Sequence, residues 1–462
     1  MSPCSKWRRT WTSRLPIPWG QGRNRCCLAG EGSDHVPRSL TTRVVQDPSD
    51  GFRFLPHLET EPPDLRVSFD VLGGGRIRAR MTGASVPALV GTEHKADLIA
   101  RPDEVHGAAA RLCARWKERF VDFQPVDGQR RALRDRRRPY AVAADLSGEQ
   151  EDELRTVVAD LARSGESLLF DTLLRGDDVR IEMFRSFLRS ALSREGLRVR
   201  FDSDLQLPWP MLCTGEEPTA SATTLSALFA RFLGYRHQIE HTGDAYAWIG
   251  PPRAAQQRPA VSLNHDVRVG SATRADEVAK VLTEGTACTV RTTYEELVRD
   301  FRNPHLDEQL MYFWCHGEFI GNEPEPHVLV IRLTDGASFD GHTVRELRAR
   351  HRHSSFRPLV LLNACHAGVS GASADRAFLG RMLIEHGAQG VLGPHIAMPQ
   401  AFAAEYALEF VRRYLRGEST AGRIVHELAR HFAARYRNPL GFTYGLHGGL
   451  DSRLELTSGG DA

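Results

Sequence analysis

Two apolar runs of this 462-residue chain end in residues that could carry out nucleophilic chemistry. The run 310–315 leads directly into His316 and Gly317, and the run 358–364 leads into Cys365. If both runs are neighbouring parallel strands, they lie about 4.8 Å apart and their carboxyl ends open at one edge of the sheet. The pattern therefore predicts that the imidazole of His316 and the thiol of Cys365 face each other at that edge.

This pairing is typical of covalent catalysis by a cysteine. A free thiol is mostly protonated at neutral pH, so His316 would take the proton of Cys365 and later return it to the leaving group. The tetrahedral intermediate also needs backbone N–H donors for its oxyanion. Gly317 suits that role because glycine allows close approach of the backbone, and the N–H of Cys365 is the second donor that we expect.

Cys315 and the possibility of a metal site have simpler interpretations. Cys315 precedes His316 on the expected strand, so its side chain points to the opposite face and belongs in the core. A zinc site built from the two Cys-His dipeptides is disfavoured, because successive strand residues cannot both point inward and the sequence has no CxxC spacing. We therefore expect no metal and no cofactor.

The chain resembles CHAT-domain proteins, bacterial relatives of caspases and separases in the clan of caspase-like cysteine peptidases. The resemblance covers residues 145–455 and rests on the motifs LRVRFDSDLQLPWPMLC, YFWCHGE, PLVLLNACHAG, FLGRMLIEHGAQGVLG and NPLGFTYGLHGG. It implies a catalytic dyad of His316 and Cys365, whose separation of 49 residues also fits a caspase-type signature. The sequence departs from the family pattern at Pro210, where an acidic residue is common. It also has Asn363 where metacaspase-like enzymes use Asp to bind a basic P1 side chain, so no P1 preference is carried over.

The whole chain predicts an α/β fold with a caspase-like layered sheet. Apolar strands alternate with amphipathic helices from about residue 145, which indicates mostly parallel strands with helices on both faces. Thr292 or Thr293 is expected to cap a helix that runs to about residue 301. Residues 64–81 alternate around three glycines and predict a β-hairpin within a small N-terminal β-containing region.

Four segments follow from these patterns. We expect a disordered segment over 1–60, and the hairpin region with a helix and a basic linker over 61–144. The N-terminal, pseudo-caspase-like half of the CHAT domain would occupy 145–275, and its catalytic half 276–456. The basic run at 130–138 is interpreted as a solvated linker and not as a nucleic-acid patch.

Composition favours a protein that works inside the cell, without nucleic acid or membrane contacts. The formal net charge is only +2, and arginine carries almost all of the positive charge, which indicates a GC-rich bacterial genome. Eight cysteines are scattered without framework spacing, which indicates a reducing compartment. The chain also lacks a signal-peptide apolar stretch and a run of the ~20 apolar residues that a membrane span needs, so we expect a cytoplasmic protein.

These features predict a cysteine endopeptidase that cuts partner proteins. The resemblance implies a role in bacterial defence or regulated cell death, with a protein substrate encoded nearby. An acidic insert over 318–339 is expected either to order when an activating partner binds or to be a solvated hairpin with no role in selection. Glu318, Asn363 and Asp375 are candidates to line the substrate pocket, where the acidic charges of the insert and of Asp375 would favour a basic P1 or P2 side chain. The competing hypothesis is a catalytically silent CHAT scaffold that acts as a binding or signalling module. The intact His316 and Cys365 favour the enzyme.

Overall fold

The computed structural model describes residues 62–456 apart from internal gaps. The gaps fall at 88–92, 128, 130, 134–136, 215–223, 244–257, 271–272, 321–327, 352–354, 365–377 and 455. The segment expected over 1–60 lies outside the described residues. Within the described part of the chain, no helix is long and apolar enough to cross a membrane.

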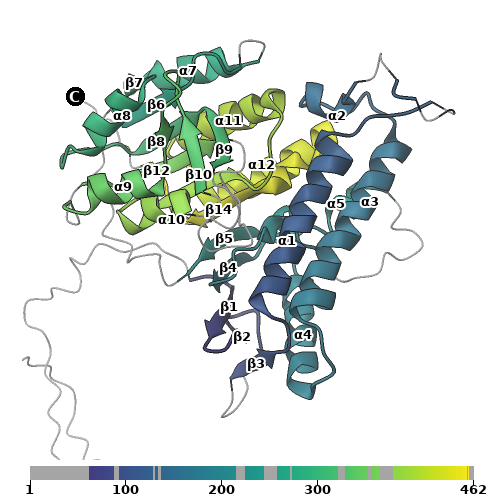
Figure 1. Cartoon of the computed structure of the whole chain (residues 1–462). Coiled ribbons are helices and arrows are strands. Elements are labelled where there is room, and N and C mark those ends of the chain that lie inside the picture. Colours follow the sequence, from purple (N-terminus) through teal and green to yellow (C-terminus); the bar gives the residue numbers. More distant parts are fainter. Residues whose placement is uncertain are drawn as a thin grey trace, which may run out of the picture. The chain divides into compact units, whose positions relative to one another are not determined.

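One large sheet organises the molecule (Figure 1). Its eleven strands run in the order β3-β2-β1-β4-β5-β14-β13-β12-β8-β6-β7, and seven of the ten described neighbour pairs are parallel. The strands are β1 (Leu65–Leu72), β2 (Arg76–Thr82), β3 (His94–Leu98), β4 (Arg198–Ser203), β5 (Gln238–Thr242), β6 (Ala260–His265), β7 (Ala287–Arg291), β8 (Leu310–Trp314), β12 (Leu359–Asn363), β13 (Gly390–Pro394) and β14 (Tyr444–Gly448). A second, antiparallel sheet contains β9 (His316–Ile320), β10 (Val328–Arg332) and β11 (Ser338–Phe339).

Helices connect the strands and cover the sheet. They are α1 (Pro102–Trp116), α2 (Pro139–Val142), α3 (Glu151–Ser167), α4 (Val179–Leu192), α5 (Leu225–Phe229), α6 (Leu233–Arg236), α7 (Ala275–Thr283), α8 (Tyr294–Phe301), α9 (Gly341–Arg348), α10 (Phe378–Glu385), α11 (Gln400–Tyr414) and α12 (Ala421–Tyr436). Thr293 caps α8: its hydroxyl accepts from the Glu296 N–H at 3.4 Å, and the Glu296 carboxylate accepts from the Thr293 N–H at 3.1 Å. This reciprocal pair satisfies donors that a helix start otherwise leaves open.

The C-terminal part of the sheet is buried on both faces, because alternate side chains of each strand enter different cores. Tyr312 and Trp314 of β8 join the core that contains α7, α11 and α12. Phe313 and Cys315 join the core of α8, α9 and α10. The prediction of a mostly parallel α/β sheet with helices on both faces is confirmed, and so is the burial of Cys315, which is 4% exposed.

The N-terminal strands belong to the same sheet. The expected hairpin forms between β1 and β2, and β1 then pairs in parallel with β4, so this region extends the main sheet. Leu65, Val67 and Phe69 are buried in the core shared with α1, α3 and α4. The opposite face carries charged pairs such as Arg78 with Asp97, whose atoms lie 2.7 Å apart. Here one face of the strands is apolar and the other is polar.

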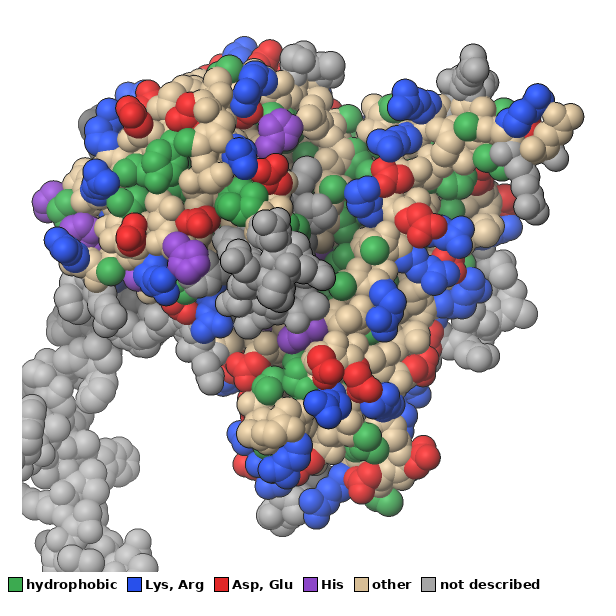
Figure 2. Space-filling view, viewed as in Figure 1, with side chains coloured by type: hydrophobic (Ala, Val, Ile, Leu, Met, Phe, Trp, Pro, Cys, Tyr) green, Lys and Arg blue, Asp and Glu red, His purple; other side chains and the backbone are tan. Residues whose placement is uncertain are grey.

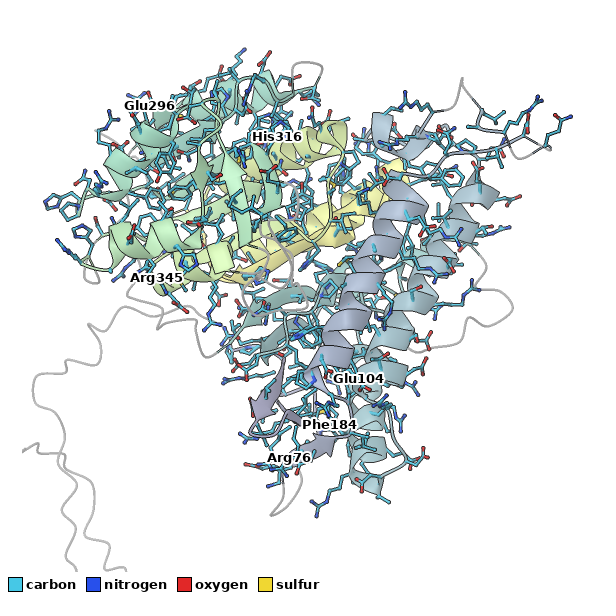
Figure 3. All side chains as sticks on the ribbon, in the orientation of Figure 1. Arg76, Glu104, Phe184, Glu296, His316 and Arg345 are labelled. Atoms are coloured by element: carbon cyan, nitrogen blue, oxygen red, sulfur yellow. The ribbon has the colours of Figure 1, made fainter. Side chains whose placement is uncertain are left out.

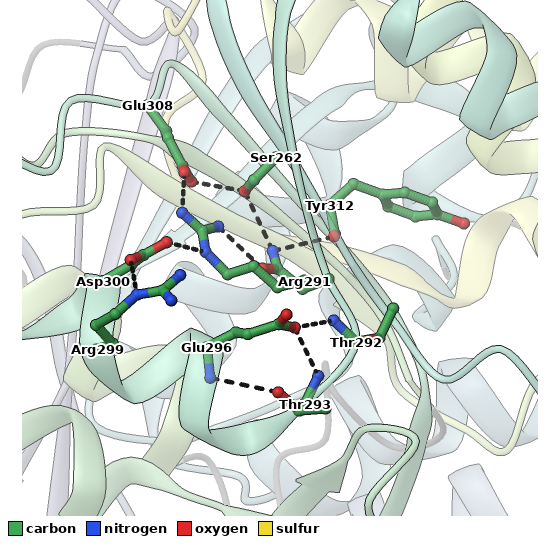
Figure 4. Close-up of polar contacts among 10 residues, drawn as sticks. Ser262, Arg291, Thr292, Thr293, Glu296, Arg299, Asp300, Glu308 and Tyr312 are labelled. Atoms are coloured by element: carbon green, nitrogen blue, oxygen red, sulfur yellow. Dashed lines mark hydrogen bonds and ion pairs between the residues drawn. The ribbon is translucent and has the colours of Figure 1, made fainter.

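A buried polar network fixes the edge formed by β6, β7 and β8 (Figure 4). Arg291 has a side chain only 2% exposed; its guanidinium donates to Asp300 at 2.7 Å and to Asn264 at 3.1 Å, and it also pairs with Glu308. Ser262 donates to Glu308 at 2.6 Å, and the Asn264 amide reaches the Tyr312 carbonyl at 3.3 Å. Such a network holds strands in register, because breaking any contact leaves a buried charge or polar group unpaired.

Candidate active site

The candidate site lies where the chain reverses its direction of travel across the sheet. From β6 the chain adds β7 on one side, then returns to add β8, β12 and β13 on the other side. Ligand sites in open α/β sheets lie outside the carboxyl ends of the strands at such a switch point. A ligand site is therefore expected at the carboxyl ends of β6, β8 and β12.

His316 is at this edge, as the first residue of β9, and Cys315 alone separates it from the end of β8 (Figure 3). Its side chain is exposed, in contrast to the fully buried β8. A small pocket opens beside it at the ends of β8 and β12. The pocket is lined by Val269, Trp314, Cys315, His316, Asn363, Ala364, Met398, Gln400 and Ala403.

Strands β8 and β12 are parallel neighbours, as expected, with Trp314 opposite Asn363. His316 follows Trp314 by two residues, and Cys365 follows Asn363 by the same interval. Cys365 and Asp375 both lie outside the described residues. The strand register is compatible with the expected dyad, whose direct contact stays a prediction.

Asn363 lines the pocket, but its amide is already engaged. The side chain is buried, its Nδ2 donates to the Ala403 carbonyl at 2.8 Å, and its Oδ1 accepts from the Tyr444 hydroxyl at 2.7 Å. These contacts attach the end of β12 to α11 and β14. Asn363 is thus better suited to hold the chain before Cys365 in place than to select a substrate side chain.

Gly317 and Glu318 lie on β9, a strand that the sequence patterns did not predict. Gly317 pairs with Ile331 and His316 with Arg332 in the antiparallel ladder with β10. The exposed Glu318 forms an ion pair with Arg332. The first residues of the expected acidic insert are therefore strand residues, and the charge of Glu318 has a cationic partner. Residues 321–327 of that insert lie outside the described residues.

Asp266 is a charged neighbour of His316 that sequence reasoning missed. It follows β6, its backbone N–H donates to the Trp314 carbonyl at 2.9 Å, and its carboxylate is fully buried. Arg268 donates to that carboxylate from Nε and Nη2, each at 2.8 Å. These hydrogen bonds, chiefly, lower the pKa of Asp266, and the nearby His316 contributes. The available signal was its place directly after a buried strand.

The loop after β6 also shapes the pocket through Trp314. The indole Nε1 donates to the Val269 carbonyl at 3.0 Å. Gly270 has a φ of +86°, and a Cβ added there would lie 2.8 Å from the indole ring. Glycine is required at this position for both conformation and space. One wall of the pocket is consequently formed by backbone packed on a tryptophan.

Comparison with known families agrees with this architecture. The family model of the CHAT domain matches residues 166–425, more than half of the chain. The chain therefore belongs to the CHAT domain family. The resemblance inferred from the sequence motifs is confirmed.

Individual relatives are more distant. A probable protease from Vitiosangium sp. is 30% identical over 135 residues, which is 29% of this chain and 17% of the relative. The separase–securin complex of Saccharomyces cerevisiae aligns with a TM-score of 0.44 at 9% identity, over 83% of this chain and 30% of that one. The Arg-specific cysteine proteinase gingipain R aligns with a TM-score of 0.40 at 11% identity, over 58% and 67%. The chain thus spans less than a third of the length of the first two proteins.

Proposed function

We propose that this protein is a CHAT-type cysteine endopeptidase that cuts partner proteins with Cys365 and His316. The observation that carries the proposal is the parallel register of β8 and β12, because the two strands that precede His316 and Cys365 in the sequence end at one edge of the sheet, where His316 is exposed. Membership of the CHAT family and a relative named as a probable protease support it.

The chemistry proceeds through an acyl-enzyme. His316 accepts the thiol proton as the Cys365 sulfur attacks the scissile carbonyl carbon, and the backbone N–H groups of Gly317 and Cys365 donate to the oxyanion. The C–N bond then breaks, and His316 gives the proton to the departing amine. Water, deprotonated by His316, hydrolyses the thioester and restores the thiol. The ionised Asp266 would stabilise the imidazolium that forms in each half-reaction.

The biological setting is part of the proposal. We propose a bacterial, cytoplasmic enzyme of defence or regulated cell death, with a protein substrate encoded nearby and a partner that activates it. A basic P1 preference would depend on Glu318 and Asp375. Glu318 already pairs with Arg332 and Asp266 with Arg268, so neither is an uncompensated charge.

Thiol reactivity tests the enzyme against the silent scaffold. We expect brief treatment with a peptidyl electrophile or iodoacetamide to label Cys365 first, because only a thiolate is nucleophilic. Burial raises the pKa of the Cys113 thiol to about 12 and also raises that of Cys213, so both serve as internal references for inert thiols. Mass spectrometry of the wild type and of His316→Ala measures the rates.

The outcomes of this experiment separate the two functions. Loss of fast Cys365 labelling in His316→Ala, together with peptide cleavage that Cys365→Ala abolishes, supports the peptidase. Cleavage that appears only when lysate or the neighbouring gene product is added supports an activating partner. Labelling of Cys365 no faster than that of Cys213, with and without those additions, would leave the scaffold as the correct function.

A further inference from the structure

An open hollow of about 370 Å³ lies between α1 and α3, far along the sequence from the candidate active site. Its polar lining consists mainly of Arg111, Arg115, Arg163, Ser164, Ser167 and Thr172. The contributing residues recur at helical spacing, which places them on the faces that the two helices turn toward each other. Figure 2 shows several Lys and Arg side chains, interspersed with Asp and Glu, over this part of the molecule.

Positive charge exceeds negative charge in this hollow. Among its described lining residues, Asp160 is the single acid. Arg115 donates to it from Nε at 2.9 Å and from Nη2 at 2.7 Å, Arg163 approaches within 3.4 Å and Arg119 within 3.9 Å. Partial burial acts to raise the pKa of Asp160, but the bonds and charges of these arginines outweigh it and lower that pKa. One carboxylate therefore balances one of several guanidinium groups.

Two guanidinium groups of the hollow are accessible to a ligand. The Arg163 side chain is 71% exposed, and Arg111 is exposed as well. The floor is closed, because Leu112 and Leu168 are each only 3% exposed. Binding at this hollow must therefore come from charge and hydrogen bonds at the rim, and hydrophobic insertion contributes little. Exposed arginines beside serine and threonine hydroxyls match carboxylate groups, which accept two parallel N–H donors.

We propose that this hollow is a docking site for a short acidic segment of a protein partner, whose carboxylates bind Arg111 and Arg163. Nucleic acid fits less well, because affinity for nucleic acid comes from neutralising many phosphates along a basic stripe, whereas this cluster is short.

Fluorescence anisotropy with the full chain tests the proposal. The probe is a fluorescein-labelled 12-residue peptide of alternating Glu and Ser, compared with the same peptide carrying Gln for Glu and with a 12-nucleotide single-stranded DNA. The test variant is Arg111→Glu with Arg163→Glu. Its matched control is Arg180→Glu with Arg350→Glu, which changes the net charge equally at two exposed positions outside the hollow.

We expect the wild type to bind the Glu peptide at least about tenfold tighter than the Gln peptide. The affinity of the test variant for the Glu peptide should be about tenfold lower or more, because two charge-assisted contacts are lost. The control variant should stay within about twofold, and labelling of Cys365 should be unchanged in both. Equal losses in the two variants would show a general charge effect and overturn the proposal. The proposal would also be overturned if the wild type did not bind the Glu peptide. If the wild type bound the DNA more tightly than the Glu peptide, and the test variant alone lost that binding, the hollow would be assigned to nucleic acid.

Discussion

Two pockets on one sheet contain histidines in opposite environments. His316 is exposed at the end of β8, beside the pocket shared with β12. His241 is buried on β5, in a pocket with His395, His447 and Trp209. The His241 Nε2 donates to the Ser203 carbonyl at 2.9 Å, and burial lowers the pKa of His241 to about 4.

The difference separates an exposed histidine at a strand end from a buried one that serves the fold. The ring of His241 is held neutral by its surroundings, and its ring centroid lies 5.2 Å from that of His447 across the β5–β14 pair that joins the two parts of the sheet. His316 occupies a strand end, where a substrate can approach. The same residue type therefore has different consequences according to burial alone.

The sharpest test of this comparison is a pair of substitutions. His316→Ala should lower the rate of peptide cleavage by about a thousandfold or more, because the thiol loses its base, while changing stability by only about 0.5 kcal/mol. His241→Ala should do the reverse and destabilise the fold by about 2 kcal/mol or more, with normal activity per folded molecule. Cleavage kinetics and urea denaturation measure both quantities. Comparable losses of activity in the two variants would contradict the assignment of His316 to cleavage and of His241 to stability.

Acid should destabilise the protein through its buried histidines. The folded-state pKa values of His241 and His237 are about 4 and about 3, both below the ordinary 6.5, so the unfolded chain binds more protons as the pH falls. Stability is therefore full above about pH 6.5 and declines toward pH 4, by about 3 kcal/mol for a shift of the size seen at His241.

A variant isolates the contribution of His241. His241→Gln keeps an amide donor for the Ser203 carbonyl and removes the titration, so its stability should change less steeply between pH 6.5 and 4. Urea unfolding at several pH values gives the two slopes, and His316→Gln is the matched exposed control. Identical slopes for the wild type and His241→Gln would contradict the assignment.

A smaller effect is expected at Asn363, where the pocket beside His316 meets the core. Asn363→Leu leaves the Tyr444 hydroxyl and the Ala403 carbonyl without this partner, and it should cost about 1–3 kcal/mol of stability. Because the end of β12 then loses an attachment, labelling of Cys365 should also slow. Asn363→Asp keeps the acceptor for Tyr444 but replaces the donor to the Ala403 carbonyl with a second acceptor, so it should also lose stability at neutral pH. Unaltered stability and labelling in Asn363→Leu would exclude a positioning role.

Local patterns predicted much of the candidate site. The apolar runs identified β8 and β12, because strands covered on both faces need apolar side chains at every position. Strand alternation then assigned Cys315 to the core and left His316 on the other face. The helix start at Thr293 and the hairpin between β1 and β2 could also be predicted from the sequence, because both depend on residues within a few positions of each other. Strand β9 was not predicted, because its sequence contains polar residues and a glycine and has no apolar run.

Only the tertiary structure decided which distant segments meet. The pairing of β1 with β4 joins residues more than 130 positions apart, and the pairing of β14 with β5 links the two parts of the sheet. The same long-range packing buries His241, gathers the network around Arg291 and brings Asp266 beside His316. Apart from the place of Asp266 after a buried strand, these features have no local sequence signal, because burial and charge environment depend on neighbours that the fold, and not the adjacent residues, supplies.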